Sequence, residues 1–328
     1  MIKKLTLTIL IITLFYSCDR VKYPKGHYPD IVTNFTEVNS EYDDYNSDLD
    51  IVFGGFNLCF SSNRHSKGND FDIILYNVDI TWDQRIGKLN MNVSNEIQGD
   101  NISLINTPNN ELGPYSFITL PYNDLFLYAS DENGDYNINY LWNSKIFNVE
   151  FLKTESNELY PSFYGKDVYF TCRSYDKKME FINKIEKIIY CSDKDGNFDI
   201  YEVNIPQNSN IVDVIRSSEA YPSIKLDINS NYDDKCPFVN GSLLVFSSNR
   251  PGGYGGYDLY FSIYENGAWS QPTNFGANIN SEYDEYRPIT HFEHDFDNNL
   301  MIFSSNRPRG LGGFDLYYVG IPKNIKIQ

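Results

Sequence analysis

The stretch FSSNRPGGYGGYDLYF at 246–261 decides the fold, because it recurs as FSSNRPRGLGGFDLYY at 303–318. A third copy, FSSNRHSKGNDFDIILY, lies at 60–76, and weaker copies lie at 128–140 and 190–203. Each copy has the pattern of a hairpin: a strand, a turn rich in Ser, Asp, Asn and Gly, and a second strand that begins aromatic, Asp or Asn, aliphatic. Five such hairpins predict an array of similar β units.

The spacing of the copies sets the size of one unit. Their first residues, Phe60, Tyr128, Tyr190, Phe246 and Phe303, are 68, 62, 56 and 57 residues apart. That is enough chain for four strands with their loops, and a helical period is almost absent. The sequence therefore predicts an all-β protein, a β-propeller of five blades with four antiparallel strands each. Because the segment 160–173 also resembles 236–250, a six-bladed ring is the alternative.

A second repeated element predicts how the ring closes. TNFGANINSEYDEY at 273–286 parallels TNFTEVNSEYDDY at 33–45, and NSNYDDKCP at 229–237 is a further copy. The last repeat stops after its third strand, whereas residues 31–38 have the sequence of an outer strand without a blade. We expect this N-terminal strand to complete the last blade and so to remove an exposed sheet edge. The first hairpin is expected near 51–78 and the last near 286–319.

The first 18 residues have the pattern of an export signal. Two lysines precede an apolar run from Leu5 to Tyr16, which is too short to span a bilayer. The stretch LFYSC that ends at Cys18 resembles a bacterial lipobox, in which the cysteine is acylated. We predict lipidation at Cys18, a tether over 19–30 and one propeller domain over 31–328, with plain secretion as the alternative. The expected location is the bacterial cell envelope, as an outer-membrane lipoprotein facing the periplasm or the cell surface.

Composition narrows the class of partner. The chain carries a net charge of −17, with 41% hydrophobic and 16% aromatic residues. An acidic field disfavours nucleic acid and anionic lipid, so we expect contact with the membrane through the lipid anchor only. Cations, basic protein surfaces and neutral glycans are compatible with it. Export would bring the cysteines into an oxidising compartment, where Cys172–Cys191 is the disulfide that we would expect.

The repeats resemble those of a known family. The segment WSQPTNFGANINSEYDEYRP at 269–288, with the FSSNRP and GGFDLYY that follow it, is similar to the WD40-like repeats of TolB-like β-propellers in envelope proteins of Bacteroidetes. The resemblance covers nearly the whole mature chain. It implies a propeller fold, an envelope location and contact with another protein, and it implies no catalytic residue.

Charged residues that recur in blade after blade are expected to hold the blades together, because one active site cannot be repeated around a ring. The aspartates of the hairpins are expected to accept hydrogen bonds at turns. The arginines after FSSN are expected to pair with acids such as those of the EYDE segments and to fix one blade against the next. These residues are Asp72, Asp199, Asp258 and Asp315, with Arg64, Arg250 and Arg307.

The sequence contains no evident catalytic motif: GxSxG, HExxH and a histidine-based triad are all missing. A glycosidase needs only two suitably separated carboxylates, and the 44 acidic residues leave that class open. The loops DENGD at 131–135 and DKDGNFD at 193–199 could bind calcium, although their spacing departs from the twelve-residue calcium loop. We expect no cofactor, with calcium as the alternative.

Unrepeated segments are the candidates for binding a partner. They are a basic insertion at 174–187, an Asn-rich connection at about 91–113, and connections that bear aromatic residues. The candidate partner-binding residues are Lys177, Lys178, Lys184, Lys187, Tyr254 and Trp269. We expect a non-catalytic envelope lipoprotein whose propeller binds another envelope protein as a scaffold or accessory subunit. The alternative is a glycan-binding or glycan-cleaving propeller.

Overall fold

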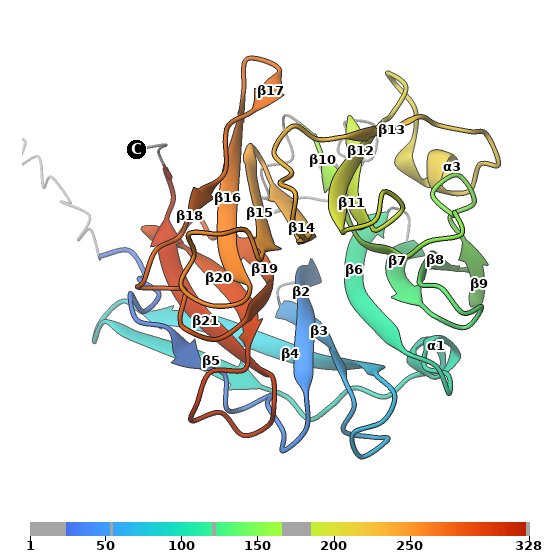
Figure 1. Cartoon of the computed structure of the whole chain (residues 1–328). Coiled ribbons are helices and arrows are strands. Elements are labelled where there is room, and N and C mark those ends of the chain that lie inside the picture. Colours follow the sequence, from blue (N-terminus) through green and yellow to red (C-terminus); the bar gives the residue numbers. More distant parts are fainter. Residues whose placement is uncertain (1–23, 53–54, 120–122, 166–184, 326–328) are drawn as a thin grey trace, which may run out of the picture.

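The computed structural model describes residues 24–52, 55–119, 123–165 and 185–325, and in these ranges most of the regular structure is β-strand. The strands form five antiparallel sheets that follow one another around a ring (Figure 1). Two short helices, α1 (Asp100–Ile105) and α3 (Ile211–Ile215), lie in connections. Neither has the length that a helix needs to cross a bilayer. The predicted all-β propeller of five four-stranded blades is confirmed, which excludes the six-bladed alternative.

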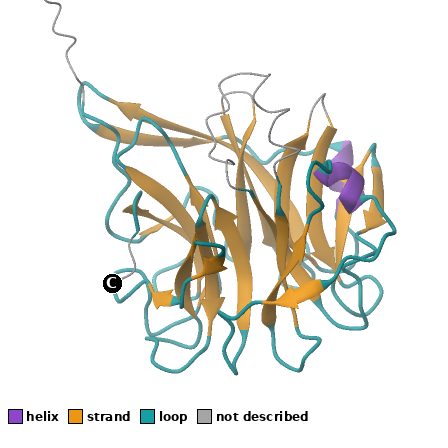
Figure 2. Cartoon of the chain, turned by 90° about the horizontal axis from the view of Figure 1, so that it is seen from above, coloured by secondary structure: helices purple, strands orange, loops and turns teal. Residues whose placement is uncertain are grey.

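Each blade is built from consecutive strands, and the connecting loops lie at the two ends of the strands (Figure 2). Blade 1 contains β2 (Asp44–Val52), β3 (Gly55–Ser62), β4 (Asp72–Asp83) and β5 (Lys88–Val93). Blade 2 contains β6 (Glu111–Thr119), β7 (Asn123–Ser130), β8 (Asn137–Trp142) and β9 (Lys145–Asn148). Blade 3 contains β10 (Glu158–Tyr164), β11 (Lys187–Ser192), β12 (Asp199–Asn204) and β13 (Ser223–Lys225).

The last two blades depart slightly from this plan. Blade 4 contains β14 (Asp234–Asn240), β15 (Leu243–Ser248), β16 (Asp258–Glu265), β17 (Ala268–Trp269) and β18 (Thr273–Asn274), and the last two both pair with β16. Blade 5 takes its outer strand from the other end of the chain and contains β19 (Glu285–His291), β20 (Asn298–Ser305), β21 (Asp315–Pro322) and β1 (Thr33–Asn34).

The first strands of the blades surround the axis, where each contacts the next in a closed circle. Each of them carries a β-bulge after its second residue. The bulged residue has a φ between 45° and 62° in every blade, and these residues are Asn46, Gly113, Tyr160, Cys236 and Arg287. A positive φ is unfavourable for most side chains, so its repetition five times indicates that the ring requires this bend. A Cβ on Gly113 would lie 2.3 Å from the ring of Tyr160, which shows how closely the bulges meet.

The N-terminal strand closes the ring, as predicted. β1 pairs antiparallel with β21, with Thr33 opposite Tyr318. Phe35, which is 1% exposed, packs edge-on against Tyr318 with ring centroids 5.3 Å apart. The Asn39 side chain hydrogen-bonds both the N–H and the C=O of Leu316. The first segment therefore covers the edge of blade 5 without a covalent link, and Figure 1 shows it in dark blue beside the red last blade.

Residues 24–30, for which the sequence predicts part of a tether, pack against blade 5. Tyr28 is fully buried and stacks on Phe296, with 4.1 Å between ring centroids. The side chain of Asn298 hydrogen-bonds the N–H and the C=O of Tyr28. The signal peptide at 1–18 and the lipidation site Cys18 lie outside the described residues, so both stay predictions.

Candidate functional site

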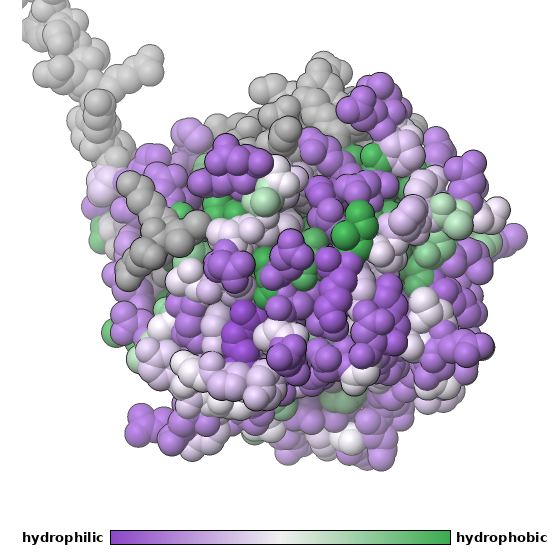
Figure 3. Space-filling model, turned by 45° about the horizontal axis from the view of Figure 1, so that its top comes forward, coloured by the Kyte–Doolittle hydropathy of each residue, from purple (hydrophilic) through white to green (hydrophobic). Residues whose placement is uncertain are grey.

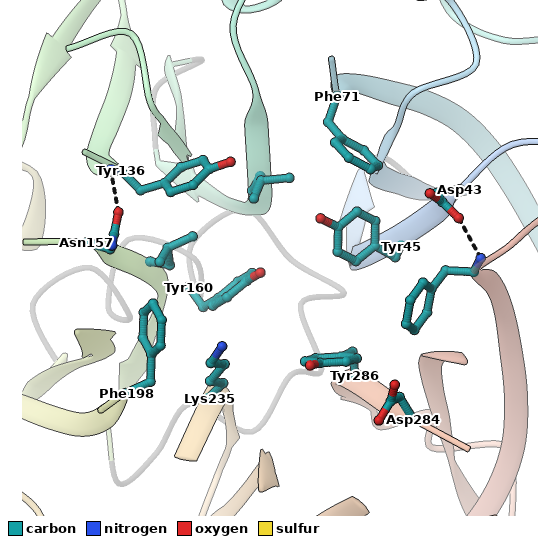
Figure 4. A pocket seen from close by; sticks show the side chains of 13 residues that line it. Asp43, Tyr45, Phe71, Tyr136, Asn157, Tyr160, Phe198, Lys235, Asp284 and Tyr286 are labelled. Carbon is teal, nitrogen blue, oxygen red and sulfur yellow. Dashed lines mark hydrogen bonds between the residues drawn. The ribbon is translucent and has the colours of Figure 1, made fainter. Parts of the chain in front are cut away.

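A pocket of about 550 Å³ lies at the axis of the ring. Its lining comes from all five blades, which places it where the inner strands begin, just before the bulges. Figure 4 shows its side chains arranged around one shared space. The lining residues are Asp43, Tyr45, Phe71, Leu112, Tyr136, Asn157, Leu159, Tyr160, Phe198, Lys235, Asp284, Tyr286 and Phe314.

An inner ring of the wall is formed by the second residue of each inner strand. In chain order these residues are Tyr45, Leu112, Leu159, Lys235 and Tyr286. The bulge directly after this position separates it from the regular alternation of the strand, so all five side chains can face the pocket mouth. The residue at this position is tyrosine or leucine in blades 1, 2, 3 and 5 and lysine in blade 4.

An outer ring is formed by the aromatic residue that directly precedes each third strand. These residues are Phe71, Tyr136, Phe198, Tyr257 and Phe314, and all but Tyr257 line the pocket. The two rings touch edge-on: 4.8 Å separates the centroids of Tyr45 and Phe71, and 5.7 Å separates those of Tyr286 and Phe314. Such packing holds the rings rigidly and leaves aromatic surface toward the cavity.

The two carboxylates of the wall, Asp43 and Asp284, hold neighbouring blades together. Asp284 Oδ1 accepts a hydrogen bond of 2.9 Å from the N–H of Tyr257 in blade 4, and its own N–H donates to Asn306 Oδ1 at 2.9 Å. Asp43 makes the same two bonds, with the N–H of Phe314 and with Asn63 Oδ1.

A hydrogen bond between an aspartate and an asparagine position, from the backbone N–H of the first to the side chain of the second, occurs in every blade. In blades 2 and 3 the two residue types are exchanged. Asn110 and Asn157 stand there in place of the aspartate, and their partners are Asp131 and Asp193. Each of the five pairs, Asp43/Asn63, Asn110/Asp131, Asn157/Asp193, Asp233/Asn249 and Asp284/Asn306, therefore contains one carboxylate and one amide. One amide donor facing one carboxylate satisfies both groups, whereas two carboxylates would repel each other.

This exchange gives a direct test in blade 5. Asn306→Asp alone places a second carboxylate beside Asp284 and is expected to lower the free energy of unfolding by about 1–2 kcal/mol. Adding Asp284→Asn recreates the arrangement of blades 2 and 3 and should restore most of that loss. Chemical denaturation of the wild type, both single variants and the double variant measures the coupling. Additive single effects would contradict the paired role.

The electrostatics of the wall centre on blade 4. Lys235 Nζ lies 4.2 Å from the centroid of the Phe198 ring and 3.5 Å from Asp233 Oδ2. Burial acts to raise the pKa of Asp233, but the hydrogen bonds from Tyr257 Oη and the Phe198 N–H, with Lys235 nearby, hold that pKa below its ordinary value. Burial raises the pKa of the phenols of Tyr45 and Tyr286, so these side chains present neutral hydroxyl groups to the pocket.

The arginines singled out from the sequence pair with the first residue of the inner strand. The three pairs are Arg64–Asp44, Arg250–Asp234 and Arg307–Glu285, at 2.5 to 2.8 Å. Each arginine belongs to the same blade as its acid, so the pair secures one blade internally, whereas we expected a link between blades. The bonds between blades come instead from the first side chain of each Asp/Asn pair, which accepts the N–H of the outer-ring aromatic residue of the neighbouring blade.

The hairpin aspartates lie at the start of the third strands. Asp258 and Asp315 each accept two backbone N–H bonds from the preceding glycine-rich loop and one bond from an Asn side chain of the outer strand. Asp199 instead pairs with Lys225, and Asp72 lies 3.4 Å from His65 Nδ1. None of the four lines the pocket.

Of the predicted partner-binding residues that the structure describes, Lys187 and Trp269 lie together, whereas Tyr254 lies apart from them. Lys187 is paired with Glu202 and lies over the ring of Tyr264, and Trp269 packs against that same ring with centroids 4.9 Å apart. Tyr254 is 53% exposed on a different loop. Lys177, Lys178 and Lys184 lie outside the described residues, as does Cys172. Cys191 is a buried thiol without a disulfide.

The candidate calcium loops have another role in the structure. Asp131 accepts two hydrogen bonds from Asn110, and Asp193 accepts two from Asn157. Across the ranges that the structure describes, no group of three or more His, Cys, Asp or Glu side chains could hold a metal ion. The geometry therefore supplies an aromatic binding pocket rather than a metal centre.

The pocket was not predicted from the sequence, although its outer-ring residues belong to the repeats that the sequence shows. Each aromatic of the outer ring is the first residue of the aromatic–Asp/Asn–aliphatic element that defines the repeat. In the sequence they stand out only as part of the hairpin pattern. In a ring, however, a repeated position that points to the axis brings five side chains to one place, so recurrence itself is the signal.

The comparisons with known proteins follow the fold. No protein-family model and no curated protein matches the chain. Among solved structures it is similar to an endo-arabinase from Bacteroides thetaiotaomicron, with a TM-score of 0.55 and 11% identity over 90% of this chain and 98% of that one. A thermostable family-43 glycoside hydrolase gives 0.54 and 9% over 92% and 93%, and a GH62 hydrolase in complex with xylotriose gives 0.52 and 10% over 90% and 97%.

These similarities correct two expectations. The assignment to the WD40-like repeats of TolB-like propellers is wrong, because the similar solved structures named above are glycoside hydrolases. The expectation of a non-catalytic scaffold for another envelope protein is overturned by the same finding. Among the described residues, large exposed hydrophobic side chains occur in every blade, for example Ile86, Phe147, Ile224, Tyr254 and Leu311. Figure 3 shows a mostly hydrophilic face. At about 10% identity the likeness establishes the fold of the chain alone, a five-bladed β-propeller.

Proposed function

We propose that this protein binds a glycan in the axial pocket. The observation that carries the proposal is the wall itself: an outer ring of aromatic side chains and an inner ring that contains two tyrosines surround a cavity of about 550 Å³. Sugar rings present flat C–H faces that pack on aromatic faces, and their hydroxyl groups bond to a few fixed polar groups at the rim. The phenols of Tyr45, Tyr136 and Tyr286 supply such groups together with the aromatic surface.

The fold comparison agrees with this choice of ligand. One of the similar structures is an endo-arabinase, and another was solved in complex with xylotriose. Both acidic composition and an aromatic pocket are compatible with carbohydrate.

The test replaces tyrosines of the inner ring by the residue that other blades carry at the same register. Leu112 and Leu159 occupy this position in blades 2 and 3, so Tyr45→Leu and Tyr286→Leu fit the blade while removing the stacking surface. We expect each variant to weaken glycan binding about tenfold, and the double variant to weaken it further. Isothermal titration calorimetry with hits from an oligosaccharide array measures this.

The control is Tyr254→Leu, which removes an exposed tyrosine away from the pocket lining. It should bind as the wild type does. If no oligosaccharide binds the wild type, or if Tyr254→Leu weakens binding as much as the pocket variants do, the proposal is wrong.

Cleavage of the bound glycan is a second candidate, and the two carboxylates in the wall are the observation that favours it. A glycosidase needs an acid and a base or nucleophile on either side of the scissile bond. Binding ranks first because Asp43 and Asp284 already accept backbone N–H bonds that asparagine accepts in blades 2 and 3. Asp43→Asn and Asp284→Asn keep those backbone bonds and remove the charge, and each also replaces the carboxylate oxygen that faces the amide of Asn63 or Asn306. Reducing sugar released by the wild type and by neither variant would establish cleavage.

A further inference from the structure

The inner ring of the pocket breaks its own repeat at Lys235. The other four blades place tyrosine or leucine at this register, so an apolar side chain is all that the blade requires there. A residue that served only the ring would recur, as the Asp/Asn pairs and the bulges do. The blade therefore does not account for the charge of Lys235, whereas recognition of a charged ligand would account for it.

The ammonium group of Lys235 keeps hydrogen-bonding capacity for a ligand. Asp233 Oδ2 lies 3.5 Å from Nζ, whereas a charge-assisted bond would be about 2.7–2.9 Å long. Asp233 is already held by the phenol of Tyr257 at 2.5 Å and by the Phe198 N–H at 3.0 Å. The side chain is 21% exposed, and in Figure 4 its nitrogen points into the space between the tyrosines.

The aromatic rings beside Lys235 strengthen its effect. Nζ lies 4.2 Å from the centroid of Phe198 and 5.4 Å from that of Tyr257, so rings replace part of the water that would otherwise screen the charge. An anion that reaches this ammonium meets a partly desolvated donor, for which electrostatic attraction is stronger than on the open surface.

The carboxylates of the wall do not cancel this preference. Asp43 and Asp284 each accept a backbone N–H and face the amide of an asparagine, which offsets their charge. In Figure 4 they lie on the far side of Tyr45 and Tyr286 from Phe198. The pocket lining therefore has its cation, Lys235, on the side of blade 4 and its two carboxylates on the side of blades 5 and 1.

We propose that the pocket selects a glycan bearing a carboxylate, such as a uronic acid residue, whose carboxylate binds Lys235 while its sugar rings stack on the aromatic wall. This inference rests on the proposed glycan binding and adds the class of ligand. Since the chain as a whole is strongly acidic, preference for an anion must come from a local contact, and Lys235 is the cation in the described lining.

The experiment compares each uronate-containing oligosaccharide of a plant and bacterial cell-wall panel with its own methyl ester and with neutral members. The ester keeps the stereochemistry and removes the charge. Calorimetric titration of the wild type is expected to show about tenfold tighter binding of the acid than of its ester. Lys235→Met should abolish this preference, so that acid and ester bind with equal affinity, and an apolar side chain fits this register. Lys235→Arg should retain it.

Lys194→Met is the matched control, since Lys194 also lies over an aromatic ring, that of Tyr201, but lies outside the pocket lining. It should keep the preference of the wild type. Equal binding of acid and ester by the wild type, or an unchanged preference in Lys235→Met, would overturn the inference and leave glycan binding intact. Failure of the whole panel to bind would instead remove the proposed function, and this inference with it.

Discussion

Replacement of Arg287 by alanine is expected to lower the free energy of unfolding by about 3–5 kcal/mol and the melting temperature by roughly 5–10 °C. Arg287 is the largest fully buried side chain of the described structure, at 0% exposure, and it projects from the bulge of blade 5. A guanidinium at such a place is costly to desolvate, so its contacts must offset that cost.

Those contacts join blade 5 to three other blades. Nη1 donates to the carbonyl oxygen of Pro237 in blade 4 at 2.8 Å, and Nη2 donates to that of Pro114 in blade 2 at 3.4 Å. The guanidinium carbon lies 5.2 Å from the ring centroid of Tyr160 in blade 3. Alanine would leave an axial cavity and two buried carbonyl groups without these donors, and both losses destabilise the ring.

Arg309→Ala is the matched control, because Arg309 also has a positive φ, 76°, but is exposed. Any effect of placing alanine in a left-handed conformation occurs in both variants, so the difference between them reports the axial contacts. Calorimetry of the two proteins at one pH gives that difference. Equal melting temperatures would show that Arg287 does not hold the blades together.

The fold could be predicted from the sequence because repeated segments specify it. The FSSNR hairpins gave the blade, their spacing gave the number of blades, and the parallel between 33–45 and 273–286 gave the closure by β1. The packing of residues 24–30 on blade 5 was harder to predict, because Tyr28 follows a stretch with lysine and proline that has the composition of a tether. The stack of Tyr28 on Phe296 and its two hydrogen bonds with the Asn298 side chain hold it in place.

The axial residues were not accessible in the same way. Asn46, Gly113, Tyr160, Cys236 and Arg287 share a register and a positive φ, but they share no chemistry, so no motif marks them. Only tertiary contact gives Arg287 its role. The pocket is hard to predict for the opposite reason, because its outer-ring aromatic residues recur so regularly that the sequence marks them as part of the hairpin and not as a site.

Lowering the pH from 8 to 5 is expected to stabilise blade 2 through Glu111, by an amount on the order of 3 kcal/mol. Glu111 is fully buried at the start of β6, and its carboxylate accepts bonds from the N–H and hydroxyl of Thr107 and from Ser130. Burial raises its pKa to about 7 from an ordinary value of 4.5, more than these hydrogen bonds lower it.

The sign follows from proton linkage. Between about pH 4.5 and 7 the folded protein holds a proton on Glu111 that the unfolded chain has released. Stability from this group is therefore greatest below the unfolded pKa and is lost as the pH rises toward 7, with no further loss above it. Other buried acids, among them Asp48 and Glu158, also have raised pKa values, so Glu111 must be isolated by a substitution.

The isolating variant is Glu132→Arg, because blade 2 lacks the arginine that pairs with the equivalent acid in blades 1, 4 and 5. Glu132 occupies that register. An arginine there can reach Glu111, Ser130 and the carbonyl of Ile105, as Arg64 reaches Asp44, Ser62 and the carbonyl of Val38. We expect the variant to stabilise the protein at pH 8 by about 2–3 kcal/mol and to flatten the pH dependence.

Glu265→Arg makes the same change of charge at an exposed position at the end of β16 and serves as the control. Unfolding by urea at pH 5, 6, 7 and 8 should give parallel curves of stability against pH for the wild type and for Glu265→Arg, and a shallower curve for Glu132→Arg. If Glu132→Arg runs parallel to the other two, Glu111 ionises normally in the folded protein. The pH dependence then belongs to the other buried acids, and the missing arginine of blade 2 has no energetic consequence.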